Sequence, residues 1–206
     1  MEENNRPSAL NLPNALSLLR MVLVPFFVWS VLAFDVGTTR GCLIPAAIFA
    51  VTSFTDFLDG QIARRCHLIT DFGKFLDPLA DKFMVFSACL VLTFRYTHLA
   101  PWMLWASVII MFRDLAVTSL RLVAAGKSGT VIAASIWGKL KTVSHIVGIL
   151  CILLEPLLLP LYGREIYPIS YTMLGVMAVS ALFSGIDYLR AYLPALGFEK
   201  PEKKES

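Results

Sequence analysis

The sequence predicts an all-α polytopic membrane protein with six transmembrane helices and an N-terminal interfacial segment. Of its 206 residues, 57% are hydrophobic and only 16% are charged, and the mean hydropathy is +0.69. This is more apolar surface than a single soluble core can hide. A membrane span takes roughly 20 apolar residues, and runs of that order recur between short polar connections. We expect one membrane domain over residues 1–198 and a disordered polar tail over residues 199–206.

The expected helices follow from apolar runs and from the residues that interrupt them. The first begins at Asn11 to Asn14, where Pro13 suits a first helical turn. Ser17 and Arg20 make its early part amphipathic, which favours an interfacial segment leading into the first span. The third span begins near Thr70-Asp71, whose side chains suit an N-cap. The six expected spans cover residues 16–34, 42–65, 72–94, 99–125, 136–161 and 167–193.

Charge and cysteine usage exclude several other classes of protein. The formal net charge is +3, and the basic residues form no dense stripe of the kind that binds nucleic acid. A disulfide framework or zinc site is not expected, because the four cysteines contain no CxxC pair. Residues 1–7 lack the order of a cleaved signal, so we expect the first apolar stretch to stay as an anchor.

The distribution of Lys and Arg predicts the orientation of the six spans. With six spans both ends lie on one side, and most basic residues in the connections and tails share that side. Basic residues are enriched on the cytoplasmic side of membrane proteins. We therefore place both termini and the active site at the cytoplasmic face. That side carries Arg6, Arg64, Arg65, Lys74, Arg121, Lys127, Lys139, Lys141, Lys200, Lys203 and Lys204, against Arg40, Arg95 and Arg164 on the other.

Four aspartates define the candidate site. Asp56 and Asp59 lie on one face of the second expected span, and Asp77 and Asp81 lie on one face of the third. Carboxylates at membrane depth are costly and mark functional sites. Hard oxygen ligands without His or Cys suit Mg²⁺, Mn²⁺ or Ca²⁺. Helix capping is an alternative for acids near the start of the third span, but it does not explain Asp56 and Asp59 near a helix C-terminus.

These acids belong to a longer spaced motif. It reads Asp56-x-x-Asp59-Gly60-x-x-Ala63-Arg64, then eight residues, then Gly73-x-x-x-Asp77-x-x-x-Asp81. Gly60 and Ala63 taken alone are equally typical of close helix packing in membranes. The complete pattern resembles the signature of the CDP-alcohol phosphatidyltransferase family, with every position filled.

The resemblance implies a homodimer of six-helix subunits in which two divalent ions, Mg²⁺ or Mn²⁺, bridge the diphosphate of a CDP-linked lipid. The family pattern implies that Asp56, Asp59 and Asp77 are the main metal ligands and that Asp81 lies close to the second metal. It implies that Asp81 accepts the proton of the attacking alcohol. The residues implied in binding CDP-diacylglycerol are Asp56, Asp59, Gly60, Ala63, Arg64, Gly73 and Asp77.

A second group of residues, all cationic, indicates the acceptor. Arg113 lies well inside an apolar helix, where a cation needs a partner, and we expect its neighbour Asp114 to point elsewhere. An anionic ligand is therefore predicted, and Arg holds phosphate well. Arg121, Lys139 and Lys141 join it as candidates for binding the acceptor phosphate, although topology alone also explains basic residues at cytoplasmic helix ends.

A further resemblance within the family narrows the choice of acceptor alcohol. Four stretches resemble the bacterial branch that uses sn-glycerol 3-phosphate: Asn11 to Arg20, Thr70 to Lys82, Arg113 to Arg121, and Gly138 to Thr142. The resemblance implies phosphatidylglycerophosphate and CMP as products and a bacterial cytoplasmic (inner) membrane location. Ser17 and Asp114 depart from that branch, since Thr and Glu are expected there.

Two alternatives stay open from sequence. A sibling transferase would use inositol phosphate, serine or phosphatidylglycerol as acceptor. A cation transporter or channel would use the intramembrane acids as an ion path, but it leaves Gly60, Ala63 and Arg64 without a purpose.

Overall fold

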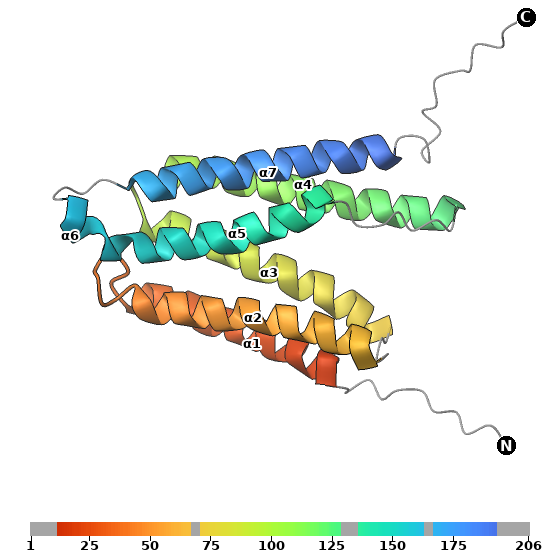
Figure 1. The fold of residues 1–206 in the computed structure, drawn as a ribbon, viewed down its shortest axis with the longest axis horizontal. Coiled ribbons are helices and arrows are strands. Elements are labelled where there is room, and N and C mark those ends of the chain that lie inside the picture. Colours follow the sequence, from red (N-terminus) through yellow and green to blue (C-terminus); the bar gives the residue numbers. More distant parts are fainter. Residues whose placement is uncertain (1–11, 67–70, 129–135, 163–166, 193–206) are drawn as a thin grey trace, which may run out of the picture.

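A computed structural model describes residues 12–66, 71–128, 136–162 and 167–192 of the chain, and the regular elements in these ranges are all helices (Figure 1). The all-α prediction is confirmed. The predicted polar tail, residues 199–206, lies outside the described residues. The helices are α1 (Leu12–Ala33), α2 (Leu43–Cys66), α3 (Asp71–Arg95), α4 (Ala100–Ser128), α5 (Ile136–Leu154), a 3₁₀ turn η1 (Glu155–Leu157), α6 (Leu159–Tyr162) and α7 (Pro168–Tyr192).

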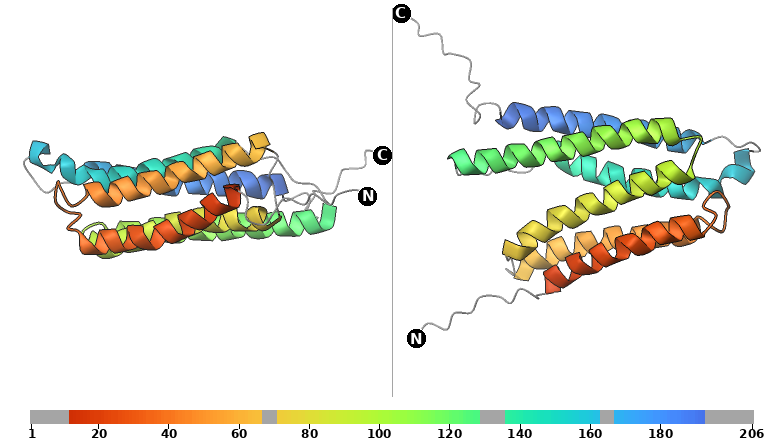
Figure 2. Two further views of the ribbon diagram at one scale, coloured as in Figure 1. Left: turned by 90° about the horizontal axis from the view of Figure 1, so that it is seen from below. Right: turned by 180° about the vertical axis from the view of Figure 1, so that it is seen from behind.

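The six long helices run alternately up and down the bundle (Figure 1). The starts of α1, α3 and α5 and the ends of α2, α4 and α7 therefore lie at one end, here called the terminal end. Helix α1 packs on α2 and α3, whereas α7 packs on α4 and α5; contacts of α3 with α4 and of α2 with α5 join the two groups. The group of α1, α2 and α3 and the group of α4, α5 and α7 move apart from each other toward the terminal end (Figures 1 and 2).

The helices have a buried core and an apolar exterior. Core residues include Phe27 and Phe49, whose ring centroids are 5.3 Å apart. Large apolar side chains such as Phe94 and Phe112 are 73% and 74% exposed. Apolar exposure of this extent is typical of a surface in contact with lipid. This protein is a membrane protein.

Among the described residues, four helical stretches are long and apolar enough to cross a membrane: 14–33 in α1, 100–123 in α4, 136–157 in α5 and η1, and 168–192 in α7. The described part of α2 contains one apolar stretch, Leu43–Asp56, which is shorter than these four. Charged residues explain why α3 fails the same criterion, since Asp77, Asp81 and Lys82 follow one another closely. The two long helices outside this set, α2 and α3, are thus the ones that carry the motif aspartates.

The fifth helix is shorter than the sequence predicted. Helix α5 ends at Leu154 rather than near residue 161, because Glu155 and Pro156 begin a 3₁₀ turn. The Glu155 side chain is 1% exposed and accepts hydrogen bonds from the backbone N–H groups of Ile169 and Ser170 at 2.8 and 2.7 Å, and from the Ser170 hydroxyl. A carboxylate at this position caps the N-terminus of α7 and complements its dipole.

We expect Glu155→Ala to destabilise the protein by about 2 kcal/mol, because it leaves buried N–H groups without an acceptor. In detergent this corresponds to a drop of roughly 4–8 °C in the thermal unfolding midpoint. Asp35→Asn is the matched control, because the Asp35 carboxylate is 71% exposed and its ion pair with Arg95 measures 3.5 Å. Such surface pairs contribute little. Equal midpoints for the two variants would contradict the capping role.

Candidate active site

The motif aspartates of α2 and α3 form what is here called the acidic side of the site. Helix α1 contacts one described aspartate on each of these two helices. Arg20 is fully buried, and its Nη1 lies 2.6 Å from Oδ1 of Asp56 on α2. The Ser17 hydroxyl donates a 2.5 Å hydrogen bond to Oδ1 of Asp77 on α3. Residues three apart share a helix face. One face of α1 therefore contacts one carboxylate from each motif helix.

This arrangement corrects the prediction of an interfacial segment. Asn14, Ser17 and Arg20 are at most 1% exposed, so they face the bundle interior rather than an aqueous interface. The segment is not a separate element either, because α1 is one helix of 22 residues. Sequence reasoning gave Ser17 and Arg20 no part in the acidic site. The available signal was their spacing of three residues within an otherwise apolar helix.

Asp81 lies one turn beyond Asp77 on α3. Its Oδ1 atom is buried and has no hydrogen-bond partner among the residues that the structure describes. The charges that act on the Asp81 carboxylate include Asp56 and Arg20, and also Lys141 and Asp114 of the second helix group. Asp81 is therefore placed within electrostatic reach of both charged regions.

The described residues do not form a complete metal centre. No group of three or more His, Cys, Asp or Glu side chains in that part of the structure is arranged to hold an ion. The side chains of Asp59, Gly60, Ala63 and Arg64 lie outside the described set, whereas Gly73 is described and buried. The predicted cluster of four carboxylates accordingly stays a prediction.

On the cationic side of the site, one carboxylate joins two cations. Oδ1 of Asp114 lies 2.9 Å from Nη1 of Arg113, and its Oδ2 lies 2.8 Å from Nζ of Lys141. Nη2 of Arg113 also donates a hydrogen bond to the Ser184 hydroxyl on α7. The prediction that Asp114 points away from Arg113 is wrong. The long Arg side chain reaches its neighbour because burial penalises an unpaired cation.

The remaining predicted cations differ in their surroundings. Arg121 donates a 2.5 Å hydrogen bond from Nη2 to the Tyr188 hydroxyl on α7. Lys139 is exposed. From α3, Nζ of Lys82 donates to the Thr118 hydroxyl on α4 at 2.5 Å. Sequence reasoning missed Ser184 and Tyr188, because the last span carries no motif.

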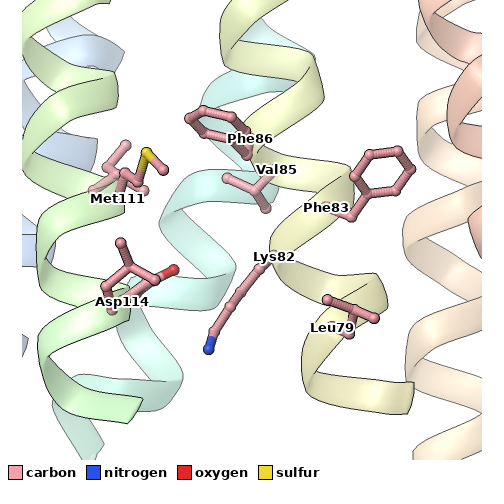
Figure 3. A pocket seen from close by; sticks show the side chains of 9 residues that line it. Leu79, Lys82, Phe83, Val85, Phe86, Met111 and Asp114 are labelled. Carbon is pink, nitrogen blue, oxygen red and sulfur yellow. The ribbon is translucent and has the colours of Figure 1, made fainter. Parts of the chain in front are cut away.

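A pocket of about 240 Å³ lies between α3 and α4, adjoining Asp114 (Figure 3). Figure 3 shows Lys82 extending from α3 toward α4, where Asp114 lies. The other lining residues are apolar: Leu79, Phe83, Val85, Phe86, Ile110, Met111 and Leu115. The pocket therefore provides a largely apolar space beside Asp114, on the cationic side of the site.

The match to a family model decides the family. Residues 10–186 match the model described as CDP-alcohol phosphatidyltransferase. The chain belongs to this family. The prediction from the spaced motif is confirmed.

Relatives within the CDP-alcohol phosphatidyltransferase family cover most of the chain. A Bacillus subtilis (strain 168) protein named CDP-diacylglycerol–glycerol-3-phosphate 3-phosphatidyltransferase is 40% identical over 195 residues, which is 90% of this chain and 97% of the relative. A Mycobacterium tuberculosis protein named probable phosphatidylglycerophosphate synthase is 36% identical over 93% of this chain and 86% of its own length. A Yersinia pestis (strain Pestoides F) protein, also named CDP-diacylglycerol–glycerol-3-phosphate 3-phosphatidyltransferase, is 35% identical over 88% of this chain and 94% of its own length.

The CDP-alcohol phosphatidyltransferase family generally depends on divalent metal ions. The described acids fit such an ion by their chemistry: all are carboxylates, and a buried Asp81 oxygen has no hydrogen-bond partner among the described residues. Arg20 and Ser17 now engage Asp56 and Asp77. The Arg20 guanidinium offsets the charge of Asp56, whereas the neutral Ser17 hydroxyl stabilises the Asp77 carboxylate by a hydrogen bond alone.

Proposed function

We propose that this protein transfers the phosphatidyl group of CDP-diacylglycerol to sn-glycerol 3-phosphate, giving phosphatidylglycerophosphate and CMP. The observation that carries the proposal is the pairing of Asp114 with Arg113 and Lys141 at 2.9 and 2.8 Å, because a cationic group of this kind suits an acceptor that carries its own phosphate. The names of relatives at 35–40% identity support both substrates.

The acidic side is proposed to bind the donor. Asp56, Asp59, Asp77 and Asp81 would hold the divalent metal, which we propose to be two ions of Mg²⁺ or Mn²⁺. When bound, the metal would polarise phosphoryl oxygens and offset the charge of the departing nucleotide. The other proposed contacts with CDP-diacylglycerol are Gly60, Ala63, Arg64 and Gly73.

Asp81 is proposed to act as the general base. A hydroxyl oxygen of glycerol 3-phosphate attacks the phosphorus that carries the diacylglycerol and forms a new P–O bond. The P–O bond to the phosphate of CMP breaks, and CMP leaves with that electron pair. The hydroxyl proton passes to the Asp81 carboxylate. A positioned carboxylate of this kind typically contributes 10²–10⁴-fold to the rate.

The cationic side is proposed to bind the acceptor phosphate through Arg113, Arg121, Lys139 and Lys141. Asp114 fixes Arg113 and Lys141 at defined positions, at 2.9 and 2.8 Å from its two oxygens. Asp114 supplies one negative charge against these four cations, so an acceptor without a phosphate, such as serine, would leave most of their charge unbalanced. That mismatch favours a phosphorylated alcohol.

The proposal is tested by offering purified protein CDP-diacylglycerol, Mg²⁺ and a mixture of glycerol 3-phosphate, inositol phosphate, serine and phosphatidylglycerol. We expect phosphatidylglycerophosphate to be the main lipid product, with stoichiometric release of CMP. A different phospholipid would replace the acceptor assignment. Metal flux into liposomes without CMP release would instead favour the transporter alternative.

Arg113→Ala is expected to raise the KM for glycerol 3-phosphate about 100-fold, because it removes a desolvated cation that binds phosphate. The KM for CDP-diacylglycerol should change less than about threefold. Arg190→Ala is the matched control, since Arg190 is an exposed cation at the same end of the bundle. Equal increases in both KM values would remove Arg113 from the acceptor site.

All six long helices are proposed to cross a bacterial cytoplasmic membrane. Helices α2 and α3 have 24 and 25 residues, and at about 1.5 Å per residue each exceeds the roughly 30 Å of the hydrocarbon layer. We place the terminal end at the cytoplasmic face from the distribution of basic residues. A homodimer is proposed from the family resemblance.

A further inference from the structure

Tyr188 on α7 contacts both arginines of the cationic side. The Cζ atoms of Arg113 and Arg121 lie 5.3 and 4.8 Å from the centroid of its ring. The two cations are eight residues apart on α4, which is about 12 Å along a helix. Because each lies about 5 Å from one centroid, their guanidinium carbons are at most about 10 Å apart.

The position of Tyr188 is tightly defined by its neighbours. The side chain is 2% exposed, and its ring stacks on Tyr192 with centroids 6.3 Å apart. On α5, a Cβ added to Gly138 would lie 3.1 Å from the Tyr188 hydroxyl oxygen. Gly138 immediately precedes Lys139 and lies three residues before Lys141. The ring therefore packs where the segments carrying all four candidate cations meet.

Charge distinguishes the two arginines. Arg113 has the Asp114 carboxylate as its partner. Arg121 is exposed, and among the described residues its polar contact is the neutral Tyr188 hydroxyl rather than a carboxylate. A hydrogen bond and a cation–π contact orient a guanidinium without neutralising it. Arg121 thus keeps its charge available for an anion.

We propose that Tyr188 is a positioning residue that holds Arg113 and Arg121 at a separation fitted to the phosphate of the acceptor. This inference rests on the proposed function and deepens it, because Tyr188 acts through the arginines and touches no reacting atom. The ring orients both cations through its π face, and the hydroxyl orients Arg121. Selectivity for a phosphorylated alcohol then depends on α7 as well as on α4 and α5.

The test compares variants of the full-length enzyme in detergent, with KM measured separately for each substrate. Tyr188→Phe keeps the ring and loses the hydrogen bond to Arg121, so we expect the KM for glycerol 3-phosphate to rise about tenfold. Tyr188→Leu also loses the cation–π contacts, and a rise of about 50-fold is expected. In both variants the KM for CDP-diacylglycerol should change less than about twofold.

Tyr192→Phe is the matched control. Tyr192 is equally buried on the same helix, and neither arginine contacts it among the interactions described. The KM for glycerol 3-phosphate should be unchanged in this variant. If Tyr188→Phe and Tyr192→Phe gave the same constants, or if Tyr188→Phe lowered kcat and raised both KM values together, Tyr188 would be structural only.

Two further comparisons sharpen the test. In an Arg121→Ala background, Tyr188→Phe should have no additional effect, because the hydroxyl acts through that arginine; additive effects would overturn the proposal. Gly138→Ala crowds the ring and should raise the KM for glycerol 3-phosphate. Gly175→Ala on α7 should not, because beyond its own stretch of helix its added Cβ would meet no described atom within 4 Å. If the unmodified protein made no phosphatidylglycerophosphate from glycerol 3-phosphate, the proposed function itself would be refuted.

Discussion

Replacing Asp81 with Asn is expected to lower the rate of phosphatidyl transfer by at least about 100-fold and up to about 10⁴-fold, the range lost with a positioned general base. The substitution keeps the shape of the side chain and removes its charge and its capacity to accept the proton. Asp81 has a buried oxygen without a hydrogen-bond partner in the described structure. The expected loss is therefore chemical rather than structural.

The measurement combines transfer of radiolabelled glycerol 3-phosphate with binding of CDP-diacylglycerol at saturating Mn²⁺. Donor affinity should stay within about threefold of the unmodified protein, because Asp56 and Asp77 are unchanged. Asp35→Asn, at the opposite end of the bundle, should have full activity. Parallel loss of transfer and donor binding would assign Asp81 to the metal site alone and leave the base unidentified.

The fold was largely predictable because its signals are local. Apolar runs place the helices, and residues that cap helices mark where they begin, as at Asp71, where α3 begins. The exception at Leu154 has a tertiary cause. Helix α5 stops before Glu155, whose carboxylate caps the start of α7. Its partners Ile169 and Ser170 are distant in sequence, so the local sequence does not reveal this contact.

The candidate site was predictable only in part. Residue spacing identified the motif acids, since the family signature has a fixed register along two adjacent helices. Spacing carries no information about contacts from other helices. Arg20 and Ser17 on α1 contact Asp56 and Asp77, and this was not foreseen.

The cationic side shows the same limitation in a different form. Helical geometry separates adjacent residues by about 100°, which suggested that Arg113 and Asp114 diverge. Burial reverses that expectation, because a buried cation gains from pairing with the nearest carboxylate and the long Arg113 side chain can reach it. Tyr188 could not be predicted either, since a tyrosine in an apolar helix carries no chemical signal until its neighbours are known.

Removal of divalent metal is expected to abolish transfer, by at least about 1,000-fold, while leaving the helical bundle folded. The metal would supply charge neutralisation that the described side chains supply only in part. Folding should persist, because Arg20 already pairs with Asp56 and Ser17 donates to Asp77. Part of the negative charge on the acidic side is thus offset by Arg20 without an ion.

The protein is treated with EDTA, and Mg²⁺ or Mn²⁺ is then added stepwise. Three quantities are measured at each step: the transfer activity, the binding of Mn²⁺ by electron paramagnetic resonance, and the thermal unfolding midpoint. Activity should return in proportion to bound Mn²⁺, without a refolding delay. Asp77→Asn should weaken Mn²⁺ binding, because it removes a proposed ligand, whereas Asp35→Asn should bind as the unmodified protein does. Full activity in EDTA would refute the metal proposal, and unfolding in EDTA would show that the contacts of Arg20 and Ser17 do not suffice to hold the acidic side together.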